Sequence, residues 1–190
     1  MTAMQVAERM TADGFIAMPV PDQGRPWNLV NGEVVVNEAG LPHQFTLRVI
    51  DRALDRWAEA HSGRGAVVFP IDIRLDPRNV FAPDAMWYSE GRVPARTDLA
   101  PLPMPDLAVE VRSASTWRYD IGAKRQGYEK HGLKELWLVD TEAESILVCR
   151  RSKPLARSFD VVLELAAGET LTSPLLPGFA LPIDTVFADR

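Results

Sequence analysis

The sequence predicts an α/β fold in which a mixed β-sheet carries helices on both faces. Apolar residues recur at helical spacing from about Pro42 to His61, and two strand-like segments, AVVFPIDIRL and VFAPDAMWY, follow. A third strand, DLAVEVR, a helix and a fourth strand, KELWLVD, come next. Because the crossover between the third and fourth strands is short, these strands should lie parallel with a right-handed connection. This αβββαβ order therefore predicts a mixed sheet flanked by helices.

The N-terminal part of the chain predicts a short helix and a β-hairpin. Thr11 stands where it can cap a helix over ADGFIAM, which Pro19 would end. The segments WNLV and EVVVN flank Asn31-Gly32, a dipeptide that supplies the two positive-φ residues of a type I′ turn. We therefore expect these two segments to pair as an N-terminal hairpin.

The middle of the chain predicts a strand pair and a long loop. The turn Asp76-Pro77-Arg78-Asn79 joins AVVFPIDIRL to VFAPDAMWY, so these segments should pair with each other. Five Gly and Pro residues then predict a loop from Ser89 to Pro105, with at most a helical turn. A loop of this length inside a compact domain is often functional.

The remaining segments complete the predicted domain. Asp120 occupies the N-cap position of a helix expected from about Ile121 to His131, and Gly132 is its stop signal. The C-terminal part predicts extra strands over SILVCRR and FDVVLEL, a closing segment LTSPLLPGFALPI and a final helical turn over DTVFADR. No repeat or linker is visible, so residues 1–190 are expected to form one domain.

Composition excludes several classes of protein. The apolar fraction of 46% and charged fraction of 25% are those of a soluble globular protein. There is no run of about 18 apolar residues, so no membrane span is expected. Glu8 interrupts the apolar residues at the N-terminus, which argues against a signal peptide and favours the cytoplasm. The single cysteine, Cys149, excludes an internal disulfide and a cysteine-based zinc site, and strand packing is its expected role.

The charge distribution is acidic overall and basic in one segment. A net charge of −5 argues against a general nucleic-acid coat. Between Arg112 and Lys134, however, six basic residues stand against Asp120 and Glu129. This local excess is compatible with a solvated helix face or with a local binding site.

Two acidic residues stand in apolar strand contexts. Glu110 lies in the middle of LAVEV, where an unpaired charge would cost several kcal/mol, so a cation, a metal ion or a proton should neutralise it. Asp84 follows Pro83, which lacks the ladder N–H and should distort the strand at that point. If the two carboxylates converge, a divalent cation such as Mg²⁺ would relieve their repulsion. The alternatives are a strand-end aspartate and a buried ion pair of Glu110 with Arg112 or Lys124.

A basic side chain would complete such a site. Lys124 and Tyr128 lie four residues apart, hence on one face of the predicted helix. A lysine near metal-bound phosphate would stabilise the charge that develops during hydrolysis. Lys124 as a solvated helix lysine and Tyr128 as a packing residue are the alternatives. No GxSxG, Walker A or GxGxxG motif occurs, and a metal-free glycosidase pair would leave the lysine without a role.

The chain also resembles a known family. NGEVV, PHQ, APDAMWY, the block from Asp106 to Tyr128 and LTSPLLPGF resemble the Uma2 family, which is similar to the PD-(D/E)XK restriction-endonuclease-like nucleases. The resemblance extends over nearly the whole chain, and it implies a restriction-endonuclease-like fold. The family often has Tyr-Glu-Leu where this chain has Trp27-Asn28-Leu29, and Ser-Pro-Ser-Thr where it has Ser113-Ala114-Ser115-Thr116.

The resemblance also implies roles for particular residues. Asp84 matches the PD aspartate and Glu110 the second acid, the two groups that hold Mg²⁺ in such nucleases. The usual lysine position is occupied by Arg112, and Lys124 looks like its migrated replacement in the following helix. Arginine stays protonated and would be a poor proton shuttle, although it could bind phosphate. Glu33 and His43 are further candidates, as a third acid and as a residue facing the same cleft.

Together these observations predict an endonuclease that needs Mg²⁺ or Mn²⁺ and hydrolyses DNA phosphodiester bonds. A homodimer is expected, because two copies of one site suit the two strands of a duplex. One alternative is a noncatalytic nuclease fold that serves as a binding or assembly module. The other is a metal-dependent hydrolase of a different phosphate ester.

Overall fold

A computed structural model describes residues 9–19 and 27–188. The N-terminal segment around Glu8, on which the interpretation about a signal peptide depends, lies outside the described residues. Within the described part of the chain, no helix is both long enough and apolar enough to cross a membrane.

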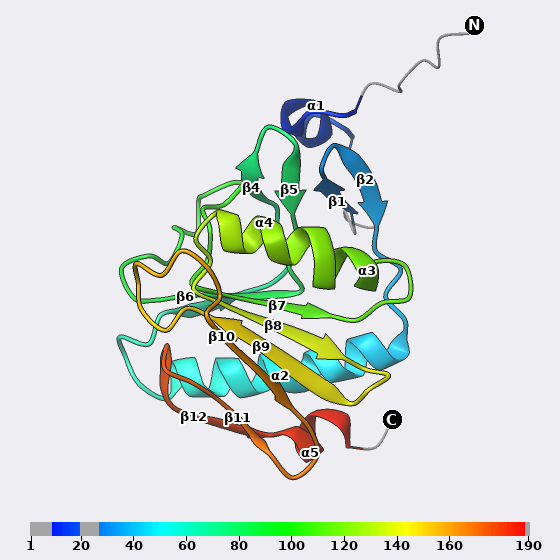
Figure 1. The fold of residues 1–190 in the computed structure, drawn as a ribbon. Coiled ribbons are helices and arrows are strands. Elements are labelled where there is room, and N and C mark those ends of the chain that lie inside the picture. Colours follow the sequence, from blue (N-terminus) through cyan, green and yellow to red (C-terminus); the bar gives the residue numbers. More distant parts are fainter. Residues whose placement is uncertain (1–8, 20–26, 189–190) are drawn as a thin grey trace, which may run out of the picture.

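A six-stranded mixed sheet forms the centre of the molecule (Figure 1). The third and fourth predicted strands, β7 and β8, pair in parallel at its centre, as the short crossover predicts, and every other neighbouring pair is antiparallel. In spatial order the strands are β10 (Val161–Leu165), β9 (Ser145–Arg150), β8 (Glu135–Asp140), β7 (Leu107–Val111), β6 (Ala85–Tyr88) and β3 (Ala66–Val68).

Helices cover both faces of this sheet, which confirms the predicted fold class (Figure 1). Helix α2 (Leu41–Glu59) packs on the face that receives Leu107, Val109 and Val111 of β7. The opposite face, which receives Ala108, lies under a helical run from residue 117 to residue 130. The run consists of α3 (Trp117–Tyr119), η1 (Asp120–Lys124) and α4 (Arg125–Lys130). The alternation along β7 is therefore confirmed.

A second, four-stranded sheet lies at one end of the central sheet. It has the order β2 (Glu33–Val36), β1 (Trp27–Val30), β5 (Asn79–Phe81) and β4 (Ile73–Asp76). The predicted hairpin is confirmed, with Asn31 at φ 51° and Gly32 at φ 80°. Helix α1 (Ala12–Ile16) is capped as expected, since Thr11 Oγ1 accepts a hydrogen bond of 3.2 Å from Gly14 N–H.

The two long strands predicted before residue 90 are each divided, which corrects the sequence interpretation. The first divides into β3 and β4, and the second into β5 and β6, so that β3 pairs with β6 in one sheet and β4 with β5 in the other. Pro70 and Pro83 stand in the two breaks. Because proline has no N–H for a strand ladder, both strands leave the sheet at these points. Residues of both breaks, namely Phe69 and Pro70 in the first and Ala82 and Asp84 in the second, line one pocket.

The C-terminal part adds a hairpin and a short helix. Strands β11 (Thr170–Ser173) and β12 (Leu176–Pro182) pair, and helix α5 (Ile183–Phe187) follows them and contacts α2, as Figure 1 shows. The loop from residue 89 to residue 105 contains turns and one isolated bridge, Ile73 with Leu102, but no helical turn. Cys149 is buried and unpaired in β9, in agreement with a packing role.

Candidate active site

Asp84 stands at the break between β5 and β6. Its N–H donates to Val109 O, and its Oδ2 accepts a hydrogen bond of 2.7 Å from Val111 N–H, so the break aims the carboxylate across β7. The residue is 5% exposed. His43 Nε2, from the first turn of α2, lies 3.1 Å from the same oxygen. His43 and Asp84 therefore come together, as expected from the idea of a shared cleft.

Glu110 lies in the middle of β7 and faces the helical run. Only 3% of it is exposed, and its charge is met by a cation, as the apolar strand predicts. Its Oε1 accepts hydrogen bonds from Lys124 Nζ, at 2.7 Å, and from the Tyr128 hydroxyl, at 2.5 Å. Lys124 and Tyr128 thus point inward from one helical face onto one carboxylate.

A π-helical turn places Lys124 in this position. The helix begins at Trp117 rather than at Ile121, so Asp120 is not its N-cap, and this corrects the sequence interpretation. In η1 the N–H of Arg125 reaches back to Asp120 O, five residues earlier. Such a widened turn rotates the side chains that follow it and is frequent at functional sites.

Asp120 joins the inward-facing cluster because of this turn. Its Oδ1 lies 2.9 Å from Lys124 Nζ, and its Oδ2 accepts a hydrogen bond of 2.9 Å from Thr116 Oγ1. Sequence reasoning missed Asp120 as a site residue. The available signal was an acid four residues before Lys124, which is the spacing of an ion pair on one helical face.

Gly127 allows the helical run to approach the second sheet closely. A Cβ atom at this position would lie 2.9 Å from Phe81 Cε2, so a larger residue would push the helix away from β5. With glycine there, the Phe81 ring packs against Tyr128, with ring centroids 5.2 Å apart. The Lys124 ammonium lies 5.7 Å from the centroid of the same ring.

The cluster contains more carboxyl groups than cations. Burial raises the pKa of Glu110 to about 8; the Lys124 ammonium opposes this rise, whereas repulsion from Asp120 and Asp84 adds to it. Burial tends to lower the pKa of Lys124, but Asp120 and Glu110 raise it above its ordinary value. Burial and the neighbouring Glu110 raise the pKa of the Tyr128 hydroxyl well above its usual range. The two carboxyl groups therefore favour the charged form of Lys124 at this position.

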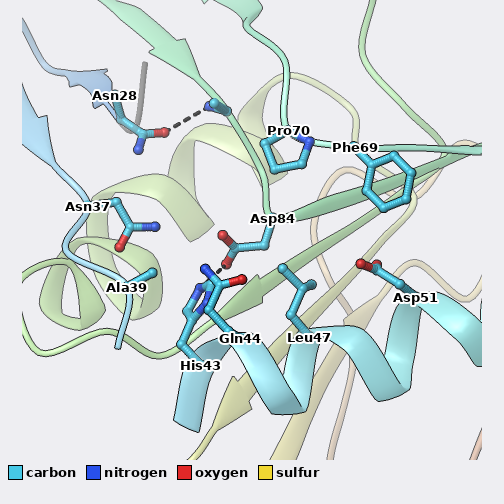
Figure 2. Close-up of a pocket in the computed structure, with 11 residues that line it drawn as sticks. Asn28, Asn37, Ala39, His43, Gln44, Leu47, Asp51, Phe69, Pro70 and Asp84 are labelled. Carbon is cyan, nitrogen blue, oxygen red and sulfur yellow. Dashed lines mark hydrogen bonds and ion pairs between the residues drawn. The ribbon is translucent and has the colours of Figure 1, made fainter. Parts of the chain in front are cut away.

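A pocket of about 360 Å³ opens beside Asp84 (Figure 2). It lies between the N-terminal half of α2 and the two strand breaks, and Asp84 and His43 line it. The other lining residues are Asn28, Asn37, Ala39, Gln44, Leu47, Asp51, Phe69, Pro70 and Ala82.

Asp51 is a pocket residue that sequence reasoning missed. It lies on the buried face of α2, and its Oδ1 is buried without a hydrogen-bond partner in the described structure. Burial raises its pKa to about 7, and repulsion from Asp55 and Asp84 adds to the rise. The available signal was a carboxylate between Leu47 and Leu54 on the apolar face of a helix, the same kind of signal that Glu110 gives in a strand.

Two of the accessory candidates lie apart from this cluster. Glu33 is exposed in the hairpin, where its Oε1 accepts a hydrogen bond of 2.8 Å from the Tyr119 hydroxyl. Arg112 donates to both Asp140 carboxylate oxygens, at 3.0 and 2.9 Å, and pairs with Glu142 at 2.6 Å. Its guanidinium is therefore paired with acidic side chains at the end of β8 and just after it.

The donor set leaves room for a hard divalent cation. In residues 9–19 and 27–188, no hydrogen bond reaches Asp84 Oδ1 or Glu110 Oε2, although the other oxygen of each carboxylate is bound. The same residues contain no group of three His, Cys, Asp or Glu side chains arranged to hold a metal. Mg²⁺ does not require such a group, since one or two carboxylates, with water and substrate phosphate, suffice.

Comparison with known proteins identifies the family. The sequence profile of Uma2, described as "Putative restriction endonuclease", matches residues 12–184. The chain belongs to the Uma2 family. A search of the curated proteins finds no match.

The Uma2 assignment agrees with a solved structure of similar fold. That structure is described as a "putative nuclease belonging to DUF820" from Anabaena variabilis ATCC 29413. It superposes with a TM-score of 0.76 at 14% sequence identity, over 94% of this chain and 97% of that one. The restriction-endonuclease-like fold expected from the resemblance is therefore confirmed.

Proposed function

We propose that this Uma2 protein is a nuclease that hydrolyses DNA phosphodiester bonds with Mg²⁺ or Mn²⁺ held by Asp84 and Glu110. One observation carries the proposal: the buried side chains of Glu110 and Asp120 share the ammonium of Lys124, and the buried Asp84 carboxylate lies close enough to raise the pKa of Glu110. Buried charge of one sign is costly unless a counter-ion balances it. A divalent cation at the two unbound oxygens would balance it.

The chain's own groups have distinct roles in this proposal. Lys124 stays protonated between Glu110 and Asp120, so it stabilises negative charge on the phosphoryl oxygens and does not take up a proton. Tyr128 fixes the orientation of Glu110 through its hydroxyl. The metal, when bound, would make an attacking water more acidic and polarise the phosphate.

The direct test is DNA cleavage by the purified protein. Plasmid and single-stranded DNA should be cut with Mg²⁺ or Mn²⁺ and left intact with a chelator. Asp84→Asn should lower the cleavage rate by at least about a hundredfold, because it removes a charged metal ligand at a preorganised site. Asp98→Asn, in the exposed loop, is the matched control and should cut normally. Cleavage by Asp84→Asn at the normal rate would refute the proposed site.

A noncatalytic binding module is the second candidate. Lys124 already pairs with Glu110 and Asp120, so this half of the cluster is neutralised in part by the chain itself. Under that function the protein would bind DNA or a partner without cutting. Absence both of cleavage and of Mn²⁺ binding in calorimetry would support it.

A stripe of arginines on α2 suggests where the DNA backbone lies. Arg48, Arg52 and Arg56 are exposed at four-residue spacing, which places them on one face of the helix. Within the described structure none of the three forms an ion pair with an acidic side chain, and Arg56 Nε donates to Arg52 O. Arg48, the first of these arginines, lies five residues after His43, and the other two lie farther from the site along α2.

Arg52→Ala is expected to weaken DNA binding at every sequence and to reduce its salt dependence. Each arginine that neutralises one phosphate contributes about 0.7 to the slope of log affinity against log salt for a single strand. Fluorescence anisotropy with a labelled oligonucleotide in chelator, at several salt concentrations, measures this slope. Arg157→Ala, an exposed arginine distant in sequence from α2, should leave it unchanged. If Arg52→Ala and Arg157→Ala gave the same slope of log affinity against log salt, α2 would not contact the DNA backbone.

A further inference from the structure

The pocket beside Asp84 has features that the proposed metal chemistry does not use. Asn28, Asn37 and Gln44 present amide groups to it from β1, from the segment after β2 and from α2, as Figure 2 shows. Asn28 Oδ1 accepts a hydrogen bond of 2.8 Å from Ala82 N–H, which leaves its Nδ2 without a hydrogen bond in the described structure. Among residues 9–19 and 27–188, the buried Asn37 Oδ1 and Asp51 Oδ1 atoms have no hydrogen-bond partner.

Unpaired buried polar atoms are unfavourable unless a ligand or water satisfies them. Asp51 is only 9% exposed, so bulk solvent does not replace the missing hydrogen bond of its Oδ1. Together the amide and carboxyl groups offer both donors and acceptors around one cavity. These groups suit a ligand that carries both hydrogen-bond donors and acceptors along one edge.

The rest of the lining suits a flat and uncharged ligand. Phe69 is 59% exposed at the break between β3 and β4, although it is a large aromatic residue, and Pro70 follows it in the lining. The lining contains no lysine or arginine, whereas it contains Asp51 and Asp84. Away from a bound metal, these two acidic side chains would therefore disfavour an anion in the pocket. The volume of about 360 Å³ lies at the small end of ligand sites, which span roughly 300–1,000 Å³.

We infer that this pocket binds an unpaired nucleobase next to the phosphate that is cut. Asparagine and glutamine amides pair with the edges of bases, and exposed aromatic rings stack on their faces. A base inside a duplex cannot reach such a pocket unless it leaves the stack, which costs a few kcal/mol. The inference rests on the proposed function, and it makes single-stranded or locally unpaired DNA the preferred substrate.

Binding of labelled oligonucleotides in chelator tests the inference without relying on cleavage. The probes are a single strand, the same strand with several abasic nucleotides, and the matching duplex. The intact strand should bind about tenfold or more tightly than the other two, since stacking of one base is worth about 1–3 kcal/mol. Phe69→Ala should lose that preference, and Phe69→Tyr should keep it. Leu155→Ala, at another exposed apolar residue, should behave as the wild type.

The results separate the two proposals. Equal binding of all three probes, or a preference that survives in Phe69→Ala, would overturn the nucleobase pocket whether or not the protein cuts DNA. Metal-dependent cleavage with equal binding would leave the nuclease function standing alone. A base preference without any cleavage would leave the pocket standing and refute the nuclease function. If the enzyme cuts DNA, the phosphodiester bond next to an abasic nucleotide should resist cleavage. Moving the abasic nucleotide along the strand should move this resistant bond with it.

Discussion

Replacing Lys124 with methionine is expected to destabilise the protein by about 3–5 kcal/mol and to abolish cleavage. The change keeps most of the side-chain volume but leaves the carboxylates of Glu110 and Asp120 buried without their shared cation. Removal of one partner from a buried ion pair has a cost of this size. Denaturant unfolding in chelator measures the loss, and a cleavage assay measures the second effect.

Metal should act differently on this variant than on an ordinary destabilised protein. In the proposed site Mn²⁺ would replace the missing positive charge near Glu110, so it should raise the unfolding free energy of Lys124→Met more than that of the wild type. Lys130→Met, at an exposed lysine of α4, is the control and should stay within about 0.5 kcal/mol of the wild type. A Lys124→Met protein as stable as this control would show that the buried cation has no structural role.

Replacing Glu110 with glutamine is expected to remove activity while preserving the fold. Glutamine has the same shape and can still accept the Tyr128 hydrogen bond through its amide oxygen. Lys124 keeps Asp120 as its partner, so no buried charge is left alone. In the proposed site the metal would lose one of its two carboxylates, and we expect the cleavage rate to fall by about 10²–10³-fold. Calorimetric titration with Mn²⁺ should show a loss of affinity in parallel.

Glu135→Gln provides the matched control for this change. Glu135 is also a buried carboxylate in the central sheet, on the neighbouring strand β8, but it is bound by Trp137 Nε1 and Ser173 Oγ. Its substitution should leave Mn²⁺ affinity and cleavage unchanged. Equal activity of Glu110→Gln and Glu135→Gln would mean that Glu110 is a structural residue only.

Much of the fold could be predicted because its signals are local. The hairpin depends on Asn31-Gly32, and the parallel pair of central strands depends on the short crossover that connects them. The divided strands could not be predicted from alternation, since the apolar pattern continues through Pro70 and Pro83. Whether a proline bends a strand or ends it depends on the partner strand, which is distant in sequence.

Several residues of the candidate site could be predicted from the sequence, but their arrangement could not. A carboxylate in an apolar strand indicated that Glu110 is buried and paired, and the structure shows Lys124 as its partner. The π-helical turn was not foreseeable, because it depends on packing of the helical run and not on a local propensity. Asp51 could not be singled out, because its burial depends on the strand breaks that pack against α2 and not on the helical pattern around it.

The most direct test of the account is a crystal structure with Mn²⁺, measured at a wavelength where manganese scatters anomalously. The account predicts one anomalous peak between Asp84 and Glu110, at the Oδ1 atom of the first and the Oε2 atom of the second. It also predicts that Lys124 stays within hydrogen-bond distance of Glu110 or Asp120. A peak elsewhere, or no peak at saturating Mn²⁺, would contradict the proposed metal site and the hydrolytic function that depends on it.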